Sequence, residues 1–222
     1  MSYRIRHHLL HWLGKILLFK KHIGKSFTSP LFSPGEYKKL KKINLACSDR
    51  IIPGWVNVDI RDIPGIDHIV DARDLSIFPD ESFDIVRASH VIEHFHINEL
   101  EKVFKEWTRI LRPGGWLIIC VPSFDITLLR YLVNPHSINP LLFSEFGTAI
   151  ISQIYGFSCT EPENEPYKHK MVYNYKSLSM LMKTYGKLKN IRSINFLLEE
   201  PYTLNILDDG TTEYSLNIAG QK

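Results

Sequence analysis

Cysteine, long apolar runs and concentrated positive charge are all scarce in this sequence. Three of its 222 residues are cysteine, and Cys47, Cys120 and Cys159 lie too far apart for a zinc-binding spacing or a disulfide framework. No apolar run is long enough to span a membrane, and no small-residue cleavage site follows the first apolar residues. We therefore expect a cytoplasmic protein with reduced thiols.

The composition also lacks the marks of a nucleic-acid-binding or disordered chain. The net charge is only +3, and no basic stripe interleaved with aromatic residues follows the central part of the chain. Hydrophobic residues make up 44% and charged residues 23%, proportions that argue against global disorder. The length suits one α/β domain with an appendage, and we expect no nucleic-acid partner. The oligomeric state is not indicated.

Residues 1–25 carry the pattern of a basic amphipathic helix. The apolar face would hold Ile5, Leu9, Trp12, Leu13, Ile16, Leu17 and Phe19, and the basic face Arg4, His7, His8, His11, Lys15 and His22. Three interpretations stay open: a helix packed on the core, peripheral membrane or partner contact through 4–23, and a lid over the site. Residues 24–35 form a loop or linker, so we expect an N-terminal unit at 1–35 and the main domain at 36–222.

Short apolar runs alternate with loops and a helix over residues 42–122. We predict strands at 43–45, 56–60, 67–70, 84–88 and 116–121, and a helix at 98–111. A helix that Ser177 caps and that ends at Tyr185, then strands at 189–198 and 214–219, would close the fold. Strands with little polar alternation indicate a parallel sheet that is buried on both faces.

Small and acidic residues follow these predicted strands. Ala46, Cys47 and Ser48 follow the first strand, and Asp59 and Asp71 end or follow the second and third. Ligands bind at this edge of an open α/β sheet, and a carboxylate at a second strand end commonly holds the ribose hydroxyls of a nucleoside.

These motifs resemble those of the class I S-adenosylmethionine-dependent methyltransferases, in the type 11-like branch with a GWVNVDI-type motif. Order and spacing agree over about eighty residues. The matching segments are INLACS at 43–48, GWVNVDI at 54–60, DARDL at 71–75, FPDESFD at 78–84, SHVIEH at 89–94 and LRPGG at 111–115.

The resemblance implies a fold, a cofactor and a set of binding residues. The fold would be a Rossmann-like, seven-stranded, mostly parallel sheet with helices on both faces, plus the N-terminal amphipathic helix and an insertion lid. S-adenosylmethionine would be the cofactor. Its binding residues would be Ala46, Cys47 and Ser48 at the methionine part, Asp59 at the ribose, Ile60, Asp71 and Ala72 at the adenine, and Ser89 and His90 beside the methionine and the substrate.

This chain departs from the family pattern in the first turn. The family usually has glycine where Ala46 and Ser48 stand, and often an acid where Asn44 stands. A Cβ costs about 1 kcal/mol or more at a position that needs positive φ. A catalytically inactive protein that keeps the fold for binding or scaffolding is therefore the alternative to an enzyme.

The segment from His90 to His94 also fits an H-x-x-E-H metal motif, which we reject. That motif needs a continuous helix, whereas His90 directly follows a predicted strand, and no third ligand is signalled downstream. We therefore expect no metal site.

Methyl transfer to a hydroxyl or amine also requires the acceptor to lose a proton, for which histidine is the usual base. The catalytic candidates are His90 first, then His94, with Glu93 as an orienting group, and His169 and Tyr173 as substrate contacts. The expected acceptor is a small molecule, a sugar or a lipid-linked glycan. Residues 123–170 form the expected substrate lid, with helices at 126–132 and 140–155 and an acidic loop at 160–167.

Overall fold

The computed structural model describes residues 31–133, 168–194 and 215–222. The predicted N-terminal amphipathic helix, the helix at 140–155 and the acidic loop at 160–167 lie outside these ranges. No helix within the described ranges has the length and apolar character that a bilayer span requires.

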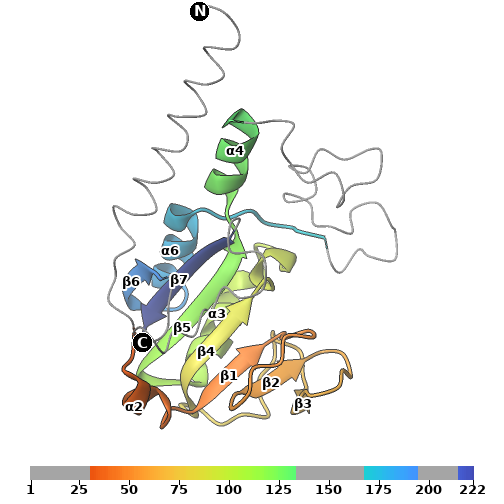
Figure 1. Cartoon of the computed structure of the whole chain (residues 1–222), viewed down its shortest axis with the longest axis vertical. Helices are drawn as coiled ribbons and strands as arrows, with labels where there is room; N and C mark the ends of the chain where they lie inside the picture. The colour runs from red at the N-terminus through yellow and green to blue at the C-terminus, as the bar shows by residue number, and fades with distance from the viewer. Residues whose placement is uncertain (1–30, 134–167, 195–214) are drawn as a thin grey trace, which may run out of the picture.

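A single seven-stranded sheet forms the centre of the protein (Figure 1). Its strand order is β3-β2-β1-β4-β5-β7-β6, and only β7 runs antiparallel to its neighbours. The strands are β1 Lys42–Leu45, β2 Val56–Asp59, β3 His68–Ile69, β4 Phe83–Ser89, β5 Leu111–Pro122, β6 Lys189–Ser193 and β7 Ser215–Gln221. The predicted mostly parallel, Rossmann-like sheet is confirmed.

The central strands are buried on both faces, as their continuous apolar runs predict. All four residues of β1 are buried, and the side chains of β4 alternate between two apolar clusters. Val86 and Ala88 belong to the larger cluster, whereas Ile85 belongs to the smaller one on the opposite face.

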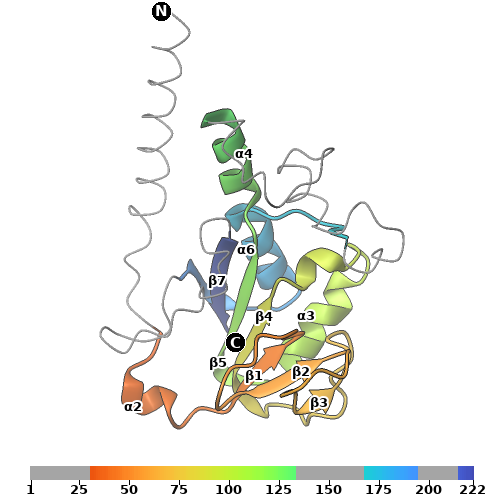
Figure 2. The ribbon, with the colours of Figure 1, turned by 45° about the vertical axis from the view of Figure 1, so that its right-hand side comes forward.

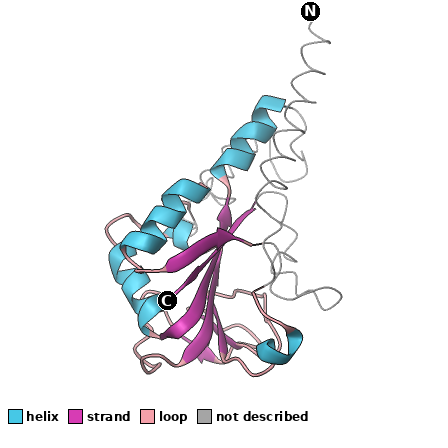
Figure 3. Cartoon of the chain, turned by 90° about the vertical axis from the view of Figure 1, so that its left-hand side faces the viewer, coloured by secondary structure: helices cyan, strands magenta, loops and turns pink. Residues whose placement is uncertain are grey.

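Helices cover the two faces unequally (Figure 3). The larger cluster lies under α3 (Leu100–Arg109) and α6 (Tyr175–Thr184), which bury Phe104, Trp107 and Leu178. The opposite face is covered by the segment of α2 (Pro34–Tyr37), where Trp55 Nε1 donates a 2.8 Å hydrogen bond to the Tyr37 hydroxyl. Helices on both faces were predicted, but α2 was not.

Local capping explains where two helices begin. Ser33 and Glu36 form a capping box at the start of α2, so this helix begins inside the predicted linker. The predicted cap of the later helix was wrong: Asn174 is the N-cap of α6, and Ser177 is the third helical residue that completes its capping box.

The chain after β4 and β5 leads to the ligand-binding edge. A short 3₁₀ helix, η1 (Ile92–His94), follows β4, and α3 begins only at Leu100. From the end of β5, α4 (Phe124–Val133) extends beyond the sheet (Figure 2). It lies where a helix at 126–132 was predicted. Turns after β1, β2 and β3 complete the same edge, because these strands are parallel to β4.

Candidate cofactor and acceptor site

The turn after β1 is built from residues in the left-handed backbone region. Ala46 has φ 48° and Ser48 has φ 51°, so both positions adopt the conformation for which the resembling family uses glycine. Between them, the backbone N–H of Cys47 donates a 3.0 Å hydrogen bond to the carbonyl of Val58 in β2. The fold therefore tolerates a Cβ at both positions, at a cost of about 1–3 kcal/mol each.

Asp59 joins this turn to the end of β2. Its side chain is almost fully buried, and Oδ2 accepts a 2.8 Å hydrogen bond from the N–H of Ser48. Oδ1 accepts 3.0 Å hydrogen bonds from both N–H and Nε of Arg61. Burial would raise the pKa of Asp59, but the hydrogen bonds from Arg61 and Ser48 hold that pKa below its usual value.

The surroundings of Asp59 fit a nucleoside once one side chain moves. Arg61 carries its guanidinium on the Asp59 carboxylate, and its side chain is 44% exposed, so it can withdraw toward solvent. Next to it, Ile60 is 60% exposed, which is unusual for so large an apolar side chain and suits contact with an adenine ring. Asp59, the residue predicted to bind the ribose, and Ile60, the residue predicted to contact the adenine, are thus adjacent.

Asp71 and Ala72 lie at the same edge, just after β3. The Asp71 carboxylate is bound by Arg73 through its N–H, Nε and Nη2, and Arg73 also pairs with Glu99 at 3.1 Å. The Arg73 hydrogen bonds hold the pKa of Asp71 below its usual value against the effect of burial. The carbonyl of Ala72 accepts a 2.8 Å hydrogen bond from the indole of Trp107.

The arginines at 61 and 73 were missed at the sequence level. Each follows a predicted ligand-binding aspartate by two residues, in the pattern Asp-x-Arg, and each binds that aspartate. The repeated spacing was the signal that would have revealed them.

Ser89 is the last residue of β4, and His90 follows it directly. Ser89 Oγ is buried and has no hydrogen-bond partner within the described ranges, so it is suited to a ligand. His90 has φ 52°, and its Nε2 lies 3.2 Å from Ser215 Oγ and 3.6 Å from Cys120 Sγ. Burial would lower the pKa of His90, but its contacts with Cys120 and Glu93 raise that pKa above its usual value.

A second group of predicted residues gathers around η1. Glu93 is 1% exposed, and its Oε1 lies 3.2 Å from His90 Nδ1. His94 stands beside His169, with ring centroids 5.0 Å apart. Burial would raise the pKa of Glu93, but the neighbouring histidines at 90, 94 and 169 lower it.

The position of His169 beside Glu93 and His94 was not predicted from the sequence. No third ligand to join the two imidazoles of the His90–His94 motif was predicted, whereas the structure places His169 with Glu93 and His94. The backbone explains it: the N–H groups of Lys170 and Met171 donate to the carbonyl of Glu93, at 2.7 and 3.2 Å. The argument against a continuous helix was sound, because η1 is a single 3₁₀ turn.

A hollow adjoins this second group. Tyr173 contributes a fully buried ring, and its hydroxyl donates a 3.4 Å hydrogen bond to the carbonyl of Ile92. Both predicted substrate residues therefore line the hollow. Among the described residues, it is lined by Glu93, Pro122, Phe124, Thr127, His169, Met171, Val172 and Tyr173.

Comparison with known proteins supports a methyltransferase. A family model described as a methyltransferase domain matches residues 56–119, which contain β2 to β4, η1, α3 and most of β5. The match supports the class I resemblance and S-adenosylmethionine as the cofactor. No curated protein matches the chain.

Solved structures of methyltransferases are similar at low identity. A SAM-dependent methyltransferase from Methanosarcina mazei is 16% identical over 87% of this chain and 99% of its own, with a TM-score of 0.49. One from Archaeoglobus fulgidus is 14% identical over 96% and 94%, also at 0.49. The 1,6-didemethyltoxoflavin-N1-methyltransferase of Burkholderia thailandensis, solved with S-adenosylhomocysteine, is 10% identical over 96% and 78%, at 0.48. Likenesses at this level carry no inference about the acceptor.

Proposed function

We propose that this protein is an S-adenosylmethionine-dependent methyltransferase that acts on an oxygen or nitrogen acceptor of a small molecule, a sugar or a lipid-linked glycan. The observation that carries the proposal is the buried Asp59 carboxylate, which lies within the matched residues 56–119 and accepts a 2.8 Å hydrogen bond from the Ser48 N–H. The hydrogen bond holds the Asp59 carboxylate beside a turn of small residues, at the sheet edge where ligands bind. There the carboxylate can accept hydrogen bonds from ribose hydroxyls.

Residues of the first three strand ends would hold the cofactor, which supplies an activated methyl group on a sulfonium. Asp59 would accept hydrogen bonds from the ribose hydroxyls after Arg61 withdraws. Ile60 would cover the adenine, and Asp71 and Ala72 would lie at the edge of that ring. The turn at Ala46, Cys47 and Ser48 would face the methionine part.

Residues after β4 would receive the acceptor. Ser89 Oγ is a buried hydroxyl beside the proposed methionine position, and His90 follows it directly. We propose His90, Glu93 and His94 as the catalytic residues, with Glu93 orienting His90 through the 3.2 Å contact to Nδ1. Alignment of the acceptor and exclusion of water are the main contributions that such a site makes to methyl transfer.

His169 and Tyr173 are the proposed substrate contacts, because both line the hollow beside Glu93. Since the Tyr173 hydroxyl donates to the backbone of Ile92, its ring offers the acceptor an apolar wall. Phe124 extends this apolar lining from the start of α4.

Calorimetric titration with S-adenosylmethionine and S-adenosylhomocysteine tests the proposal. We expect micromolar binding of both by the wild type and loss of binding in Asp59→Ala. Asp62→Ala, which removes an exposed carboxylate three residues further on, is the matched control and should bind as the wild type does. Release of S-adenosylhomocysteine in the presence of a panel of hydroxyl and amine acceptors then identifies the acceptor class.

The second candidate is a non-catalytic protein of the same fold, used for binding or scaffolding. It is favoured by the Cβ atoms at Ala46 and Ser48, where φ is positive, and by the Arg61 guanidinium on Asp59. A correctly folded wild type that binds neither S-adenosylmethionine nor S-adenosylhomocysteine supports this candidate and contradicts the first.

A peripheral membrane contact through residues 4–23 also remains a proposal from the sequence, as does a cytoplasmic location. The basic and apolar faces of this segment suit an anionic surface. Sedimentation with vesicles of mixed phosphatidylserine and phosphatidylcholine should retain the full chain, and vesicles of phosphatidylcholine alone should not. Equal retention on both would contradict an electrostatic contact.

A further inference from the structure

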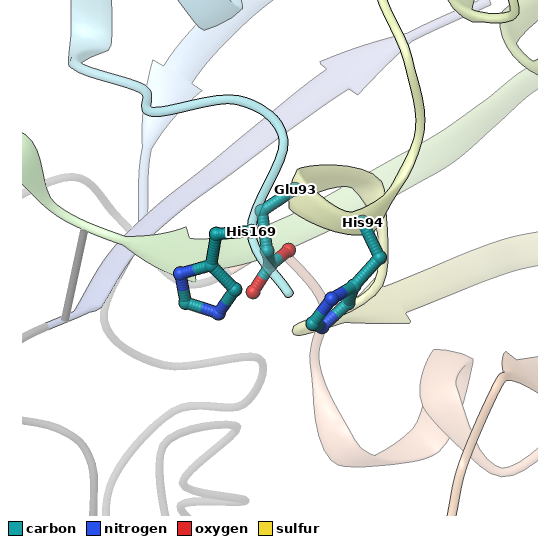
Figure 4. A group of neighbouring side chains, drawn as sticks. All are labelled: Glu93, His94 and His169. Atoms are coloured by element: carbon teal, nitrogen blue, oxygen red, sulfur yellow. The ribbon is translucent and has the colours of Figure 1, made fainter. Parts of the chain in front are cut away.

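Three side chains of types that ligate metals in other proteins lie close together (Figure 4), and two of them, Glu93 and His169, also line the hollow. Glu93 and His94 come from η1, and His169 comes from the described segment that precedes α6. One ligand atom from each lies within 4.8 Å of the other two. Two ligand atoms bound to one ion at about 2.0–2.2 Å commonly lie about 3–3.5 Å apart. Side-chain rotations that shift these ligand atoms by about 1 Å would therefore bring the three residues into coordination.

The Glu93 carboxylate is the strongest indication of a bound cation. It is 1% exposed, and its Oε2 accepts no hydrogen bond from a residue in the described part of the chain. Oε1 lies 3.2 Å from His90 Nδ1, which is the partner of that oxygen. Burying a carboxylate with one oxygen unsatisfied is unfavourable, and a cation at the same place would offset that cost.

His94 is held in the orientation and tautomer that a ligand needs. Its Nδ1 lies 3.2 Å from the carbonyl oxygen of Lys168. Because a carbonyl only accepts, Nδ1 carries the proton and Nε2 of the neutral ring keeps its lone pair. Histidines that bind metals almost always donate their other ring N–H to such a partner.

The same segment fixes the third residue. Lys168 precedes His169 directly, and the N–H groups of Lys170 and Met171 both bind the carbonyl of Glu93. Backbone groups on both sides of His169 therefore bind His94 and Glu93, and they hold the three residues close together. Metal ligands in proteins are commonly held in place by such hydrogen bonds.

We propose that Glu93, His94 and His169 bind one divalent transition-metal ion. Two imidazoles and one carboxylate favour ions such as Zn²⁺, Co²⁺ and Fe²⁺, whereas Mg²⁺ and Ca²⁺ favour sites made of oxygens alone. Three protein ligands leave coordination positions open. Since Glu93 and His169 also line the hollow, the proposed ion would lie at its wall. This proposal differs from the expectation of no metal site that the sequence alone favours.

Titration of the metal-free, tag-free full chain with Co²⁺, followed by visible absorption, tests this proposal. We expect one saturable site with d–d bands in the wild type, and at least about 100-fold weaker binding in His169→Asn and Glu93→Gln, since weaker, indirect supports already cost 10–100-fold. Zn²⁺ should displace the Co²⁺, and a large excess of Mg²⁺ should not.

The histidines at 7, 8, 11 and 22 also bind Co²⁺ in principle, so the difference between wild type and variant is the decisive quantity. His96→Asn is the matched control, because it removes an exposed imidazole next to η1 and should leave the Co²⁺ site unchanged. If Glu93→Gln fails to fold, His169→Asn decides the question. Identical Co²⁺ spectra and affinities of the wild type and His169→Asn would overturn the proposal.

The metal site does not depend on the proposed methyltransferase activity. Asp59→Ala should lose S-adenosylhomocysteine and keep Co²⁺, whereas His169→Asn should lose Co²⁺ and keep S-adenosylhomocysteine. Failure of the first result alone counts against the cofactor site, and failure of the second alone counts against the metal site.

Discussion

The backbone N–H of Ser48 donates a 2.8 Å hydrogen bond to Oδ2 of Asp59. This bond connects the turn after β1 with the end of β2 and places a buried carboxylate at the ligand-binding edge. The same carboxylate accepts two hydrogen bonds from Arg61 through its other oxygen. The proposed ribose-binding carboxylate is therefore occupied by Arg61 in this structure, and a ligand there would have to displace the guanidinium.

The first prediction concerns Arg61. In Arg61→Ala, S-adenosylhomocysteine should bind as tightly as in the wild type or up to about 10-fold more tightly, because no guanidinium must leave Asp59. This upper limit corresponds to about 1.4 kcal/mol, close to the lower end of what a charge-assisted hydrogen bond contributes. Calorimetry measures the dissociation constant. Markedly weaker binding in Arg61→Ala would show that the guanidinium holds the ligand instead of competing with it.

The second prediction concerns the strained turn. Ala46→Gly and Ser48→Gly remove a Cβ from residues at φ 48° and 51°. The relief of about 1 kcal/mol roughly offsets the added entropy of the unfolded chain, so the free energy of unfolding should change by less than about 1 kcal/mol. Denaturant unfolding measures it.

A buried alanine in an ordinary strand gives the control for that turn. Ala88→Gly in β4 should lose about 1 kcal/mol or more, since it removes a packed methyl group without relieving strain. Equal losses at Ala46 and Ala88 would contradict the strain account.

The third prediction concerns the Cys47 thiol. Burial and the nearby Asp59 raise the pKa of Cys47 to about 11, so the thiol stays protonated near neutral pH and should react slowly with iodoacetamide. Its alkylation rate in the folded protein should rise steadily as the pH approaches 11. Mass spectrometry locates the label, and the unfolded chain is the reference for full reactivity. Fast labelling of folded Cys47 at neutral pH would be inconsistent with this environment.

The fourth prediction concerns the ion pair between Asp71 and Arg73. Because Arg73 lowers the pKa of Asp71, the pair stabilises the protein at neutral pH and loses this effect as the pH falls through the lowered pKa. Both side chains are partly exposed, at 31% and 44%, so Arg73→Ala should cost only about 0.5–1 kcal/mol. The difference from the wild type should shrink in acid and in high salt. A loss that is independent of both would point to packing instead of charge.

The sheet was predictable because its strands are short, apolar and separated by clear turn residues. The positions of Asp59 and Asp71 follow from that pattern, since residues at the ends of neighbouring parallel strands meet at one edge. Even β3, with only two residues, lies inside its predicted range of 67–70. Capping was less predictable: Asn174 and Ser177 are both good caps, and only the backbone geometry distinguishes them.

The second half of the site could not be derived in full from the sequence. Candidate roles for His90, Glu93, His94 and His169 were assigned one by one, but their meeting depends on two backbone hydrogen bonds from Lys170 and Met171 to Glu93. Such long-range contacts leave no periodic signal in a single sequence. The arginine partners of Asp59 and Asp71 were, in contrast, readable from a repeated local spacing.

A crystal structure of the complex with S-adenosylhomocysteine tests the central claim most directly. The account predicts that the two ribose hydroxyls donate to the Asp59 carboxylate, that Ile60 contacts the adenine, and that the Arg61 guanidinium has left Oδ1. A nucleoside bound elsewhere, or an Asp59 carboxylate that keeps Arg61 and makes no contact with the ligand, would contradict it.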